Sequence, residues 1–131
     1  MALKIDTLDI LKSIIDHQIA MINRFDQNSI EEFSLLFIKL DHIMELEIKK
    51  MVQIIFRDSD LIFEYENNYI ILLPKTNWNN SIKILQGLQE FLSQNYKESI
   101  ITFPDDGKST NELLNRFKNL VKKNYNIDLK L

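Results

Sequence analysis

A chain of 131 residues, 45% of them apolar, fits one folded domain with a core of its own. The absence of cysteine excludes disulfides, thiolate zinc sites and a thiol nucleophile, and two glycines are too few for a glycine-rich phosphate loop. A net charge of −3 argues against a dedicated nucleic-acid-binding protein. The sequence also lacks a signal peptide and any apolar run of the ~20 residues that cross a bilayer. We therefore expect a cytoplasmic domain with no nucleic-acid partner and no membrane insertion.

The first half of the chain predicts two helices with one strand between them. Apolar residues at helical spacing indicate a helix over 8–25, and a polar stretch at 26–29 ends it. Residues 33–40 (FSLLFIKL) are apolar with little alternation, which is typical of a central strand buried on both faces. Helical spacing then returns over 43–56.

The segment that follows predicts a β-hairpin. Residues 61–66 and 69–73 have strand character, and Asn67-Asn68 lies between them. Asparagine tolerates positive φ better than most residues that carry a side chain, so this pair suits a tight two-residue turn. Pro74 has no N–H to donate to a neighbouring strand, and we expect it to end the second strand.

The last part of the chain alternates helices and strands. It predicts a helix over 78–95 capped by Thr76 or Asn77, a strand over 99–103, a helix over 110–124 and an edge strand over 125–131. The centre of the whole pattern, strand-helix-strand-strand-helix-strand, is the ferredoxin-like arrangement. The predicted fold class is α/β (α+β), with a mainly antiparallel sheet of about five strands and flanking helices. We expect one domain over 1–131, with an N-terminal helix in 1–28 and the core in 33–131.

Four segments in this order carry a family resemblance. They are SLLFIKLDHI from residue 34, RDSDLIFEYENNYIILLP from residue 57, KTNWNNSIKILQGLQEFL from residue 75, and ITFPDDGKSTNELLNRFKNL from residue 101. Together they resemble the first strand, the signature hairpin, the next helix and the late strand-turn-helix unit of the GGDEF domain of diguanylate cyclases. The resemblance covers most of residues 33–125. It implies a nucleotidyl-cyclase-like fold and a place in bacterial signalling by cyclic di-GMP.

The sequence departs from the family at the residues that do the chemistry. Lys39 stands where the resemblance places a metal-binding aspartate, whereas Asp41 matches the second acidic position. The turn Glu66-Asn67-Asn68 replaces Gly-Gly-Asp/Glu-Glu and is one residue shorter, and the guanine-recognising segment after Asp41 is missing. A divalent cation needs anionic oxygen where Lys39 lies. We therefore expect no catalytic residues, no metal, no cofactor and no enzyme activity.

One family feature remains in the sequence. Arg57 and Asp60 match the Arg-x-x-Asp site that binds cyclic di-GMP in the family, because arginine can hold a phosphate and aspartate can accept guanine N–H groups. The alternative is a local ion pair and helix-to-strand cap, since a pattern with two fixed positions is common by chance.

Three aromatic residues are candidates for binding a partner. Trp78 follows a helix cap, and Tyr65 and Tyr69 flank the hairpin turn; each residue lies either on an interface or against the domain's own core. The leading hypothesis is a catalytically inactive GGDEF-like domain that acts as a protein-interaction or scaffold module, with an unknown protein partner or by self-association. The alternative is a cyclic di-GMP receptor that uses Arg57 and Asp60. The third hypothesis is an enzyme of unrelated chemistry.

Overall fold

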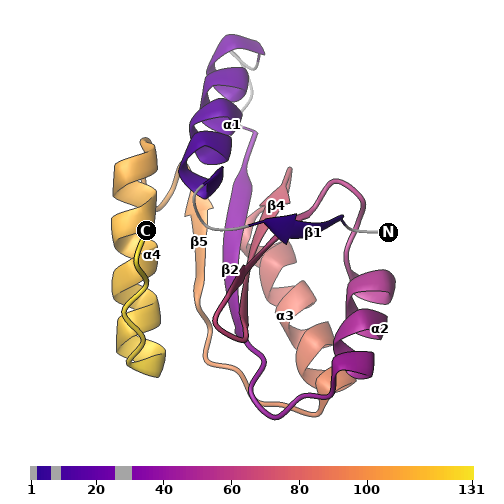
Figure 1. The fold of residues 1–131 in the computed structure, drawn as a ribbon. Helices are drawn as coiled ribbons and strands as arrows, with labels where there is room; N and C mark the ends of the chain where they lie inside the picture. The colour runs from indigo at the N-terminus through magenta and orange to yellow at the C-terminus, as the bar shows by residue number, and fades with distance from the viewer. Residues whose placement is uncertain (1–2, 7–9, 26–30) are drawn as a thin grey trace.

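The computed structural model describes residues 3–6, 10–25 and 31–131 (Figure 1). The helices and strands follow one another in this order: β1 (Leu3–Asp6), α1 (Leu11–Phe25), β2 (Phe33–Lys39), α2 (Glu45–Ile55), β3 (Leu61–Tyr65), β4 (Asn68–Pro74), α3 (Trp78–Leu92), β5 (Ile100–Phe103) and α4 (Thr110–Tyr125). Within these described residues, no helix has the length and apolarity that crossing a membrane requires.

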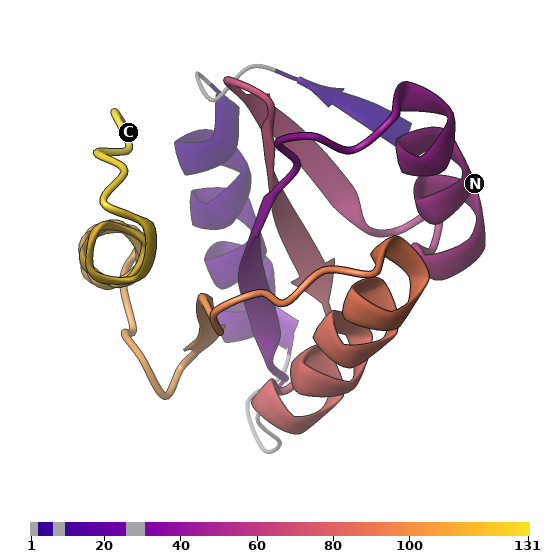
Figure 2. The same ribbon diagram turned by 90° about the horizontal axis from the view of Figure 1, so that it is seen from below.

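One sheet separates two layers of helices. Its strand order is β1-β3-β4-β2-β5; the pairs β3–β4, β4–β2 and β2–β5 are antiparallel, and β1 runs parallel to β3. Helices α1 and α4 cover one face, and α2 and α3 cover the other (Figure 2). The predicted mixed α/β fold with a mainly antiparallel sheet is confirmed for β2 to β5.

Strand β2 is the centre of the domain, as its unbroken apolar run predicts. It pairs with β4 on one side and β5 on the other. Leu35 and Phe37 enter the core under α1 and α4, and Leu36 and Ile38 enter the core under α2 and α3, all with no exposed surface. Because both faces are buried, the strand has no polar alternation.

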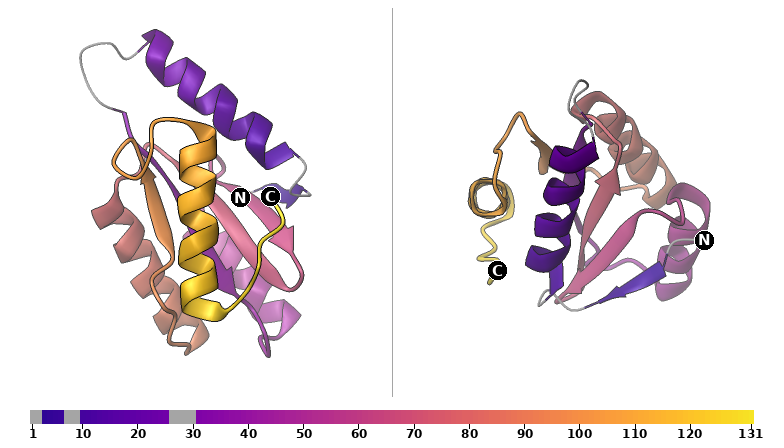
Figure 3. Two further views of the ribbon diagram at one scale, coloured as in Figure 1. Left: turned by 90° about the vertical axis from the view of Figure 1, so that its left-hand side faces the viewer. Right: turned by 90° about the horizontal axis from the view of Figure 1, so that it is seen from above.

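The predicted edge strand over 125–131 is wrong. Helix α4 continues to Tyr125, and Asn126 ends it in the left-handed conformation with φ 57°. The rest of the chain runs back across the hairpin strands without joining the sheet (Figure 3). Leu129 is buried in the core and Ile127 packs against it, while Lys122 pairs with Asp128 at 3.1 Å. Alternating apolar residues fit a strand and a packed extended tail equally well, and tertiary packing decided between them.

The fifth strand of the sheet comes from the other end of the chain. Leu3 of β1 lies opposite Leu61, and Lys4 lies opposite Ile62, so β1 extends the sheet beyond β3. The sequence pattern did not indicate this strand, because it is only four residues long and its partner is far away in the chain.

The hairpin turn lies one residue earlier than predicted. Glu66 and Asn67 have φ values of 42° and 62°, which is the pattern of a two-residue hairpin turn. Asn68 is already the first residue of β4, opposite Tyr65, and it is 4% exposed. At the other end of β4, Pro74 is the last strand residue as expected, and the side chain of Asn77 caps α3 by accepting the N–H of Asn80 at 2.8 Å.

Candidate functional site

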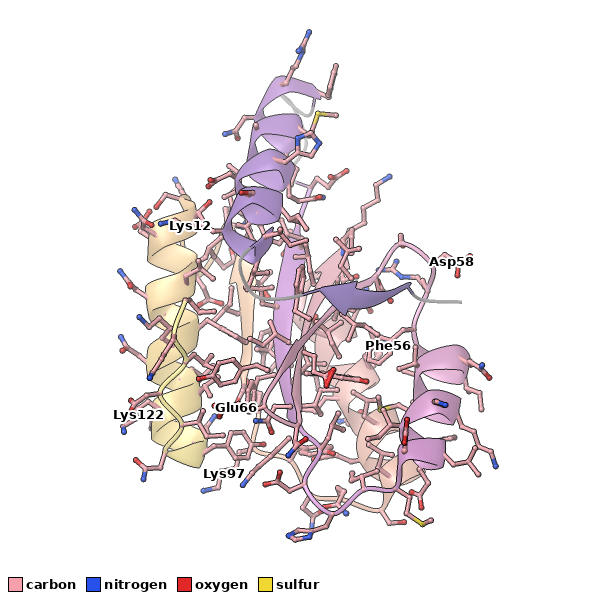
Figure 4. The ribbon with its side chains drawn as sticks, in the orientation of Figure 1. Lys12, Phe56, Asp58, Glu66, Lys97 and Lys122 are labelled. Atoms are coloured by element: carbon pink, nitrogen blue, oxygen red, sulfur yellow. The ribbon has the colours of Figure 1, made fainter. Side chains whose placement is uncertain are left out.

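The family resemblance places an active site where β2 ends beside the hairpin, and the structure has a hollow of about 630 Å³ there. Glu66 lies at the hairpin tip near this end of the sheet (Figure 4). The hollow is lined by residues from the loop after β2, from the start of α2 and from the hairpin: Leu40, Asp41, His42, Ile43, Glu45, Ile48, Lys49, Glu64, Asn67 and Tyr69. The charged side chains of this lining are mainly acidic, with Asp41, Glu45 and Glu64 against Lys49.

An ion pair lies at the end of β2. Lys39 Nζ is 3.2 Å from Asp41 Oδ2, and both side chains are about two-fifths exposed, at 39% and 42%. Asp41 matches the second aspartate of the family's strand-end pattern, and the ammonium of Lys39, which stands at the metal-binding position, lies against it. In the described part of the chain, this hollow included, no group of three or more histidine, aspartate and glutamate side chains comes together in a way that suits a metal ion.

Tyr69 is the buried wall of this hollow. It is 6% exposed and belongs to the core beneath α2 and α3. Burial raises the pKa of its hydroxyl above the ordinary value, and the nearby carboxylates of Glu64 and Glu45 raise it further. Tyr69 therefore remains a neutral phenol at physiological pH. It can donate a hydrogen bond at the hollow but cannot act as an anion or a base.

Arg57 and Asp60 form a closed local motif. Asp60 is buried, with 1% of its side chain exposed, and its Oδ2 accepts the main-chain N–H of Arg57 at 2.8 Å. Its Oδ1 accepts the guanidinium of Arg57 twice, from Nε at 3.1 Å and Nη2 at 2.8 Å. Nη2 also donates to the carbonyl of Pro74 at 2.8 Å and to Thr76 Oγ1 at 3.0 Å.

These contacts fix the entry into β3 and leave little of the pair for a ligand. Both carboxylate oxygens of Asp60 are already acceptors, and two of the three guanidinium nitrogens of Arg57 are already donors within the domain. Asp58, in the same turn, points outward instead (Figure 4). The arrangement is that of an ion pair and cap between α2 and β3. A ligand that bound the Asp60 carboxylate would have to replace hydrogen bonds that hold the fold, whereas the Arg57 side chain is 49% exposed.

Tyr65 and Tyr69 do not form one exposed surface, because they pack against cores on opposite faces of the sheet. Tyr65 packs against the core under α1 and α4, and its hydroxyl donates to the carbonyl of Asp128 at 3.2 Å. Tyr69 lies on the opposite face of the sheet. Strand alternation could have shown this, because a two-residue turn at either position puts these residues on opposite faces. Partner binding by either tyrosine stays a prediction.

Trp78 is the exposed member of the three aromatic candidates. It is the first residue of α3, is 40% exposed, and lines a groove of about 730 Å³ beside β5. We call this the β5 groove; its other lining residues are Glu98, Ile100, Ile101, Thr102, Asp105, Asp106, Arg116, Asn119, Leu120 and Lys123. Sequence analysis missed these residues because they come from three separate segments that meet only in the folded chain.

Comparisons with known proteins show likeness in fold. No protein-family model and no curated protein matches the sequence. Among solved structures, the chain is similar to a sensory box/GGDEF family protein from Caulobacter crescentus, with a TM-score of 0.58 and 15% sequence identity over 87% of this chain and 91% of that chain. The chain therefore has a GGDEF-like fold.

Proposed function

We propose that this chain is a catalytically inactive GGDEF-like domain that acts as a protein-interaction or scaffold module in bacterial signalling. The observation that carries the proposal is the ion pair between Lys39 and Asp41 at the end of β2. A cyclase of this family would need carboxylate oxygen there to hold divalent cations. An ammonium group at the same place repels a cation and neutralises the carboxylate that remains.

The surrounding backbone supports the same proposal. The hairpin turns through Glu66 and Asn67, whose side chains occupy the place where glycines would let phosphates approach the main chain. Asp41 is followed by α2 from Glu45 onward, which leaves no room for a guanine-binding segment. Metal, phosphate and base recognition are thus all lost, although the apolar core that builds the fold is kept.

The β5 groove is the surface that we propose for the partner. Tryptophan is enriched among the residues that dominate interface energies, and Trp78 is the aromatic candidate with a large exposed area. Basic Arg116 and Lys123 and acidic Glu98 and Asp105 line the same groove, which fits an apolar anchor within a polar surface. The proposed occupant is a protein, and self-association is the alternative occupant.

The first prediction concerns catalysis. Incubation of the purified domain with GTP and either Mg²⁺ or Mn²⁺, followed by chromatography, is expected to yield no cyclic di-GMP above a sample without protein, because Lys39 opposes cation binding. An active diguanylate cyclase assayed in parallel is the control for the conditions. Product formation that scales with the concentration of this domain would refute the proposal of an inactive site.

The second prediction concerns the partner surface. A photoreactive amino acid placed at Trp78 is expected to give a discrete crosslinked adduct in the host cell, whereas the same group at exposed Lys50 on α2 is not. An excess of wild-type domain should reduce the amount of this adduct. The Trp78→Ala domain should need a concentration at least about tenfold higher for the same reduction, because it lacks the proposed interface anchor. Equal adducts from both positions, or equal competition by both proteins, would place the interface elsewhere.

A further inference from the structure

The hollow at the end of β2 has a lining that the proposed function does not use. At this end of the sheet the chain passes from β2 across to α2 (Figure 1), and the hairpin contributes Glu64 and Tyr69. The three carboxylates of the lining outnumber its one lysine, and apolar side chains lie among them. Its volume of about 630 Å³ is within the range of small-molecule sites.

The hydroxyl of Tyr69 is an unpaired polar group in this hollow. The residue is 6% exposed, and its ring belongs to the core beneath α2 and α3. No described residue forms a hydrogen bond with the hydroxyl, yet it is not among the side-chain atoms that the described part of the chain seals in its interior without a partner. The hydroxyl therefore opens into the hollow, where its oxygen is free to accept a hydrogen bond.

Glu64 lies beside this hydroxyl with an uncompensated charge. It is opposite Tyr69 in the ladder of β3 and β4, so the two side chains leave the same face of the sheet as neighbours. Among the described residues, no lysine, arginine or histidine forms an ion pair with Glu64, whereas the other two carboxylates of the lining each lie next to a lysine. An unpaired carboxylate and an unpaired hydroxyl thus offer two adjacent acceptors to one N–H donor group.

Apolar side chains form another part of the wall. Leu40 is 5% exposed, and Ile43 and Ile48 pack against the core beneath α2 and α3. All three line the hollow. A ligand with a hydrocarbon body can bury apolar surface against them, which a hydrated metal ion cannot.

This lining does not suit a metal ion or an anion. A divalent cation needs several converging oxygen ligands, and no group of acidic or histidine side chains in the described part of the chain provides them. A phosphate needs basic groups, but Lys49 lies 3.9 Å from Glu45 and shares the hollow with two further carboxylates. The remaining kind of ligand is a cation that carries both N–H donors and hydrocarbon.

We propose that this hollow binds a small aliphatic amine in its ammonium form. The ammonium group donates to the carboxylate of Glu64 and to the hydroxyl oxygen of Tyr69, and the hydrocarbon chain lies along Leu40 and Ile48. Both acceptors are groups that the fold itself leaves unpaired. The proposal does not depend on partner binding at the β5 groove, which other residues line.

Titration of the purified domain with 1,4-diaminobutane tests the site. Amide NMR spectra near neutral pH and at constant ionic strength should show saturable shifts at Glu64 and Tyr69. The uncharged 1,4-butanediol should bind at least about tenfold more weakly, because it cannot form a charge-assisted hydrogen bond. A Kd above ~10 mM for the diamine, or equal binding of the diol, would overturn the proposal.

Two variants locate the ammonium group. Glu64→Gln keeps the length of the side chain but removes its charge, and should raise the Kd about 10- to 100-fold. Tyr69→Phe keeps the buried ring and should raise the Kd at least about threefold, the effect of one neutral hydrogen bond. Glu47→Gln is the matched control, because it removes the same charge from an exposed side chain of α2 outside the lining and should leave the Kd of wild type.

The control separates a built site from the general attraction of an acidic protein for cations. An equal loss of affinity in Glu47→Gln and Glu64→Gln would show that overall charge holds the amine. That result, or an unchanged Kd in either Glu64→Gln or Tyr69→Phe, would overturn the proposal.

A third ligand distinguishes a free amine from a lysine side chain of another protein. Nα-acetyl-lysine amide carries one alkylammonium group on a peptide unit. We expect it to bind no more tightly than 1,4-diaminobutane, whose second ammonium group also meets the acidic lining. Tighter binding of the lysine amide would place a protein side chain in the hollow and overturn the assignment to a free amine.

Discussion

Replacing Asp60 with alanine is expected to lower the free energy of unfolding by about 3 kcal/mol, because the substitution removes the acceptor from several donors at once. Asp60 is buried and accepts both the main-chain N–H and the guanidinium of Arg57. Without Asp60, the main-chain N–H of Arg57 is left unpaired at the junction of α2 and β3. The guanidinium of Arg57 then keeps only its hydrogen bonds to Pro74 and Thr76. Urea denaturation followed by circular dichroism measures the change.

Ser59→Ala is the control for this experiment. Ser59 lies in the same turn but is exposed, and its substitution should change the unfolding free energy by no more than about 0.5 kcal/mol. Matching denaturation midpoints for Asp60→Ala and wild type would show that the motif does not stabilise the fold. Thermal denaturation of wild type and an Arg57→Ala variant tests the receptor alternative. A rise in the melting temperature of wild type, but not of Arg57→Ala, on adding cyclic di-GMP would favour a ligand site.

Alkaline pH is expected to destabilise the domain steeply. Burial raises the pKa values of Tyr69, Tyr96 and Tyr125 above the ordinary value of 10.0. In the unfolded chain these hydroxyls lose their protons near pH 10, whereas in the folded domain they keep them to higher pH. The unfolded state therefore binds fewer protons above pH 10, and the free energy of unfolding falls as the pH rises. Below pH 10 both states are protonated, and these groups add no pH dependence.

Tyr96→Phe separates this effect from general alkaline damage. The hydroxyl of Tyr96 is buried, its pKa is raised first by burial and then by Tyr125, and it has no hydrogen-bond partner. The phenylalanine variant should match or exceed wild-type stability at pH 7, because an unpaired buried hydroxyl costs about 1 kcal/mol or more. Its stability should also fall less between pH 10 and higher pH. Denaturation curves with equal pH slopes for the two proteins would contradict this account.

The proposed loss of catalytic residues and the preservation of the fold would have different physical origins. The fold depends on apolar side chains such as Phe37 and Ile70, which are fully buried between the two helical layers. Catalysis would depend on a few polar residues at the end of β2 and in the hairpin turn. Lys39 can replace an aspartate there because its side chain is 39% exposed, so the sheet tolerates the change.

The sequence alone determined the central features of the fold. The unbroken apolar run of β2 requires burial on both faces, which in turn requires helices on both sides of a sheet. Pro74 cannot continue a ladder, and Asn77 has the short polar side chain that a helix start needs, so both boundaries follow from local chemistry. The lysine at position 39 was also visible in the sequence, and an ammonium group repels a cation wherever the chain folds.

Only the tertiary structure decided which surfaces these elements leave open. The pattern of residues 125–131 suits both a strand and a packed tail, and the space over the core beside Tyr65 selected the tail. Arg57 and Asp60 are three residues apart in sequence, but the hydrogen bonds of Arg57 to Pro74 and Thr76 arise only where the end of β4 meets this turn. The β5 groove forms where α3, β5 and α4 meet. Such long-range contacts depend on the register and packing of the whole sheet, which no local window of sequence contains.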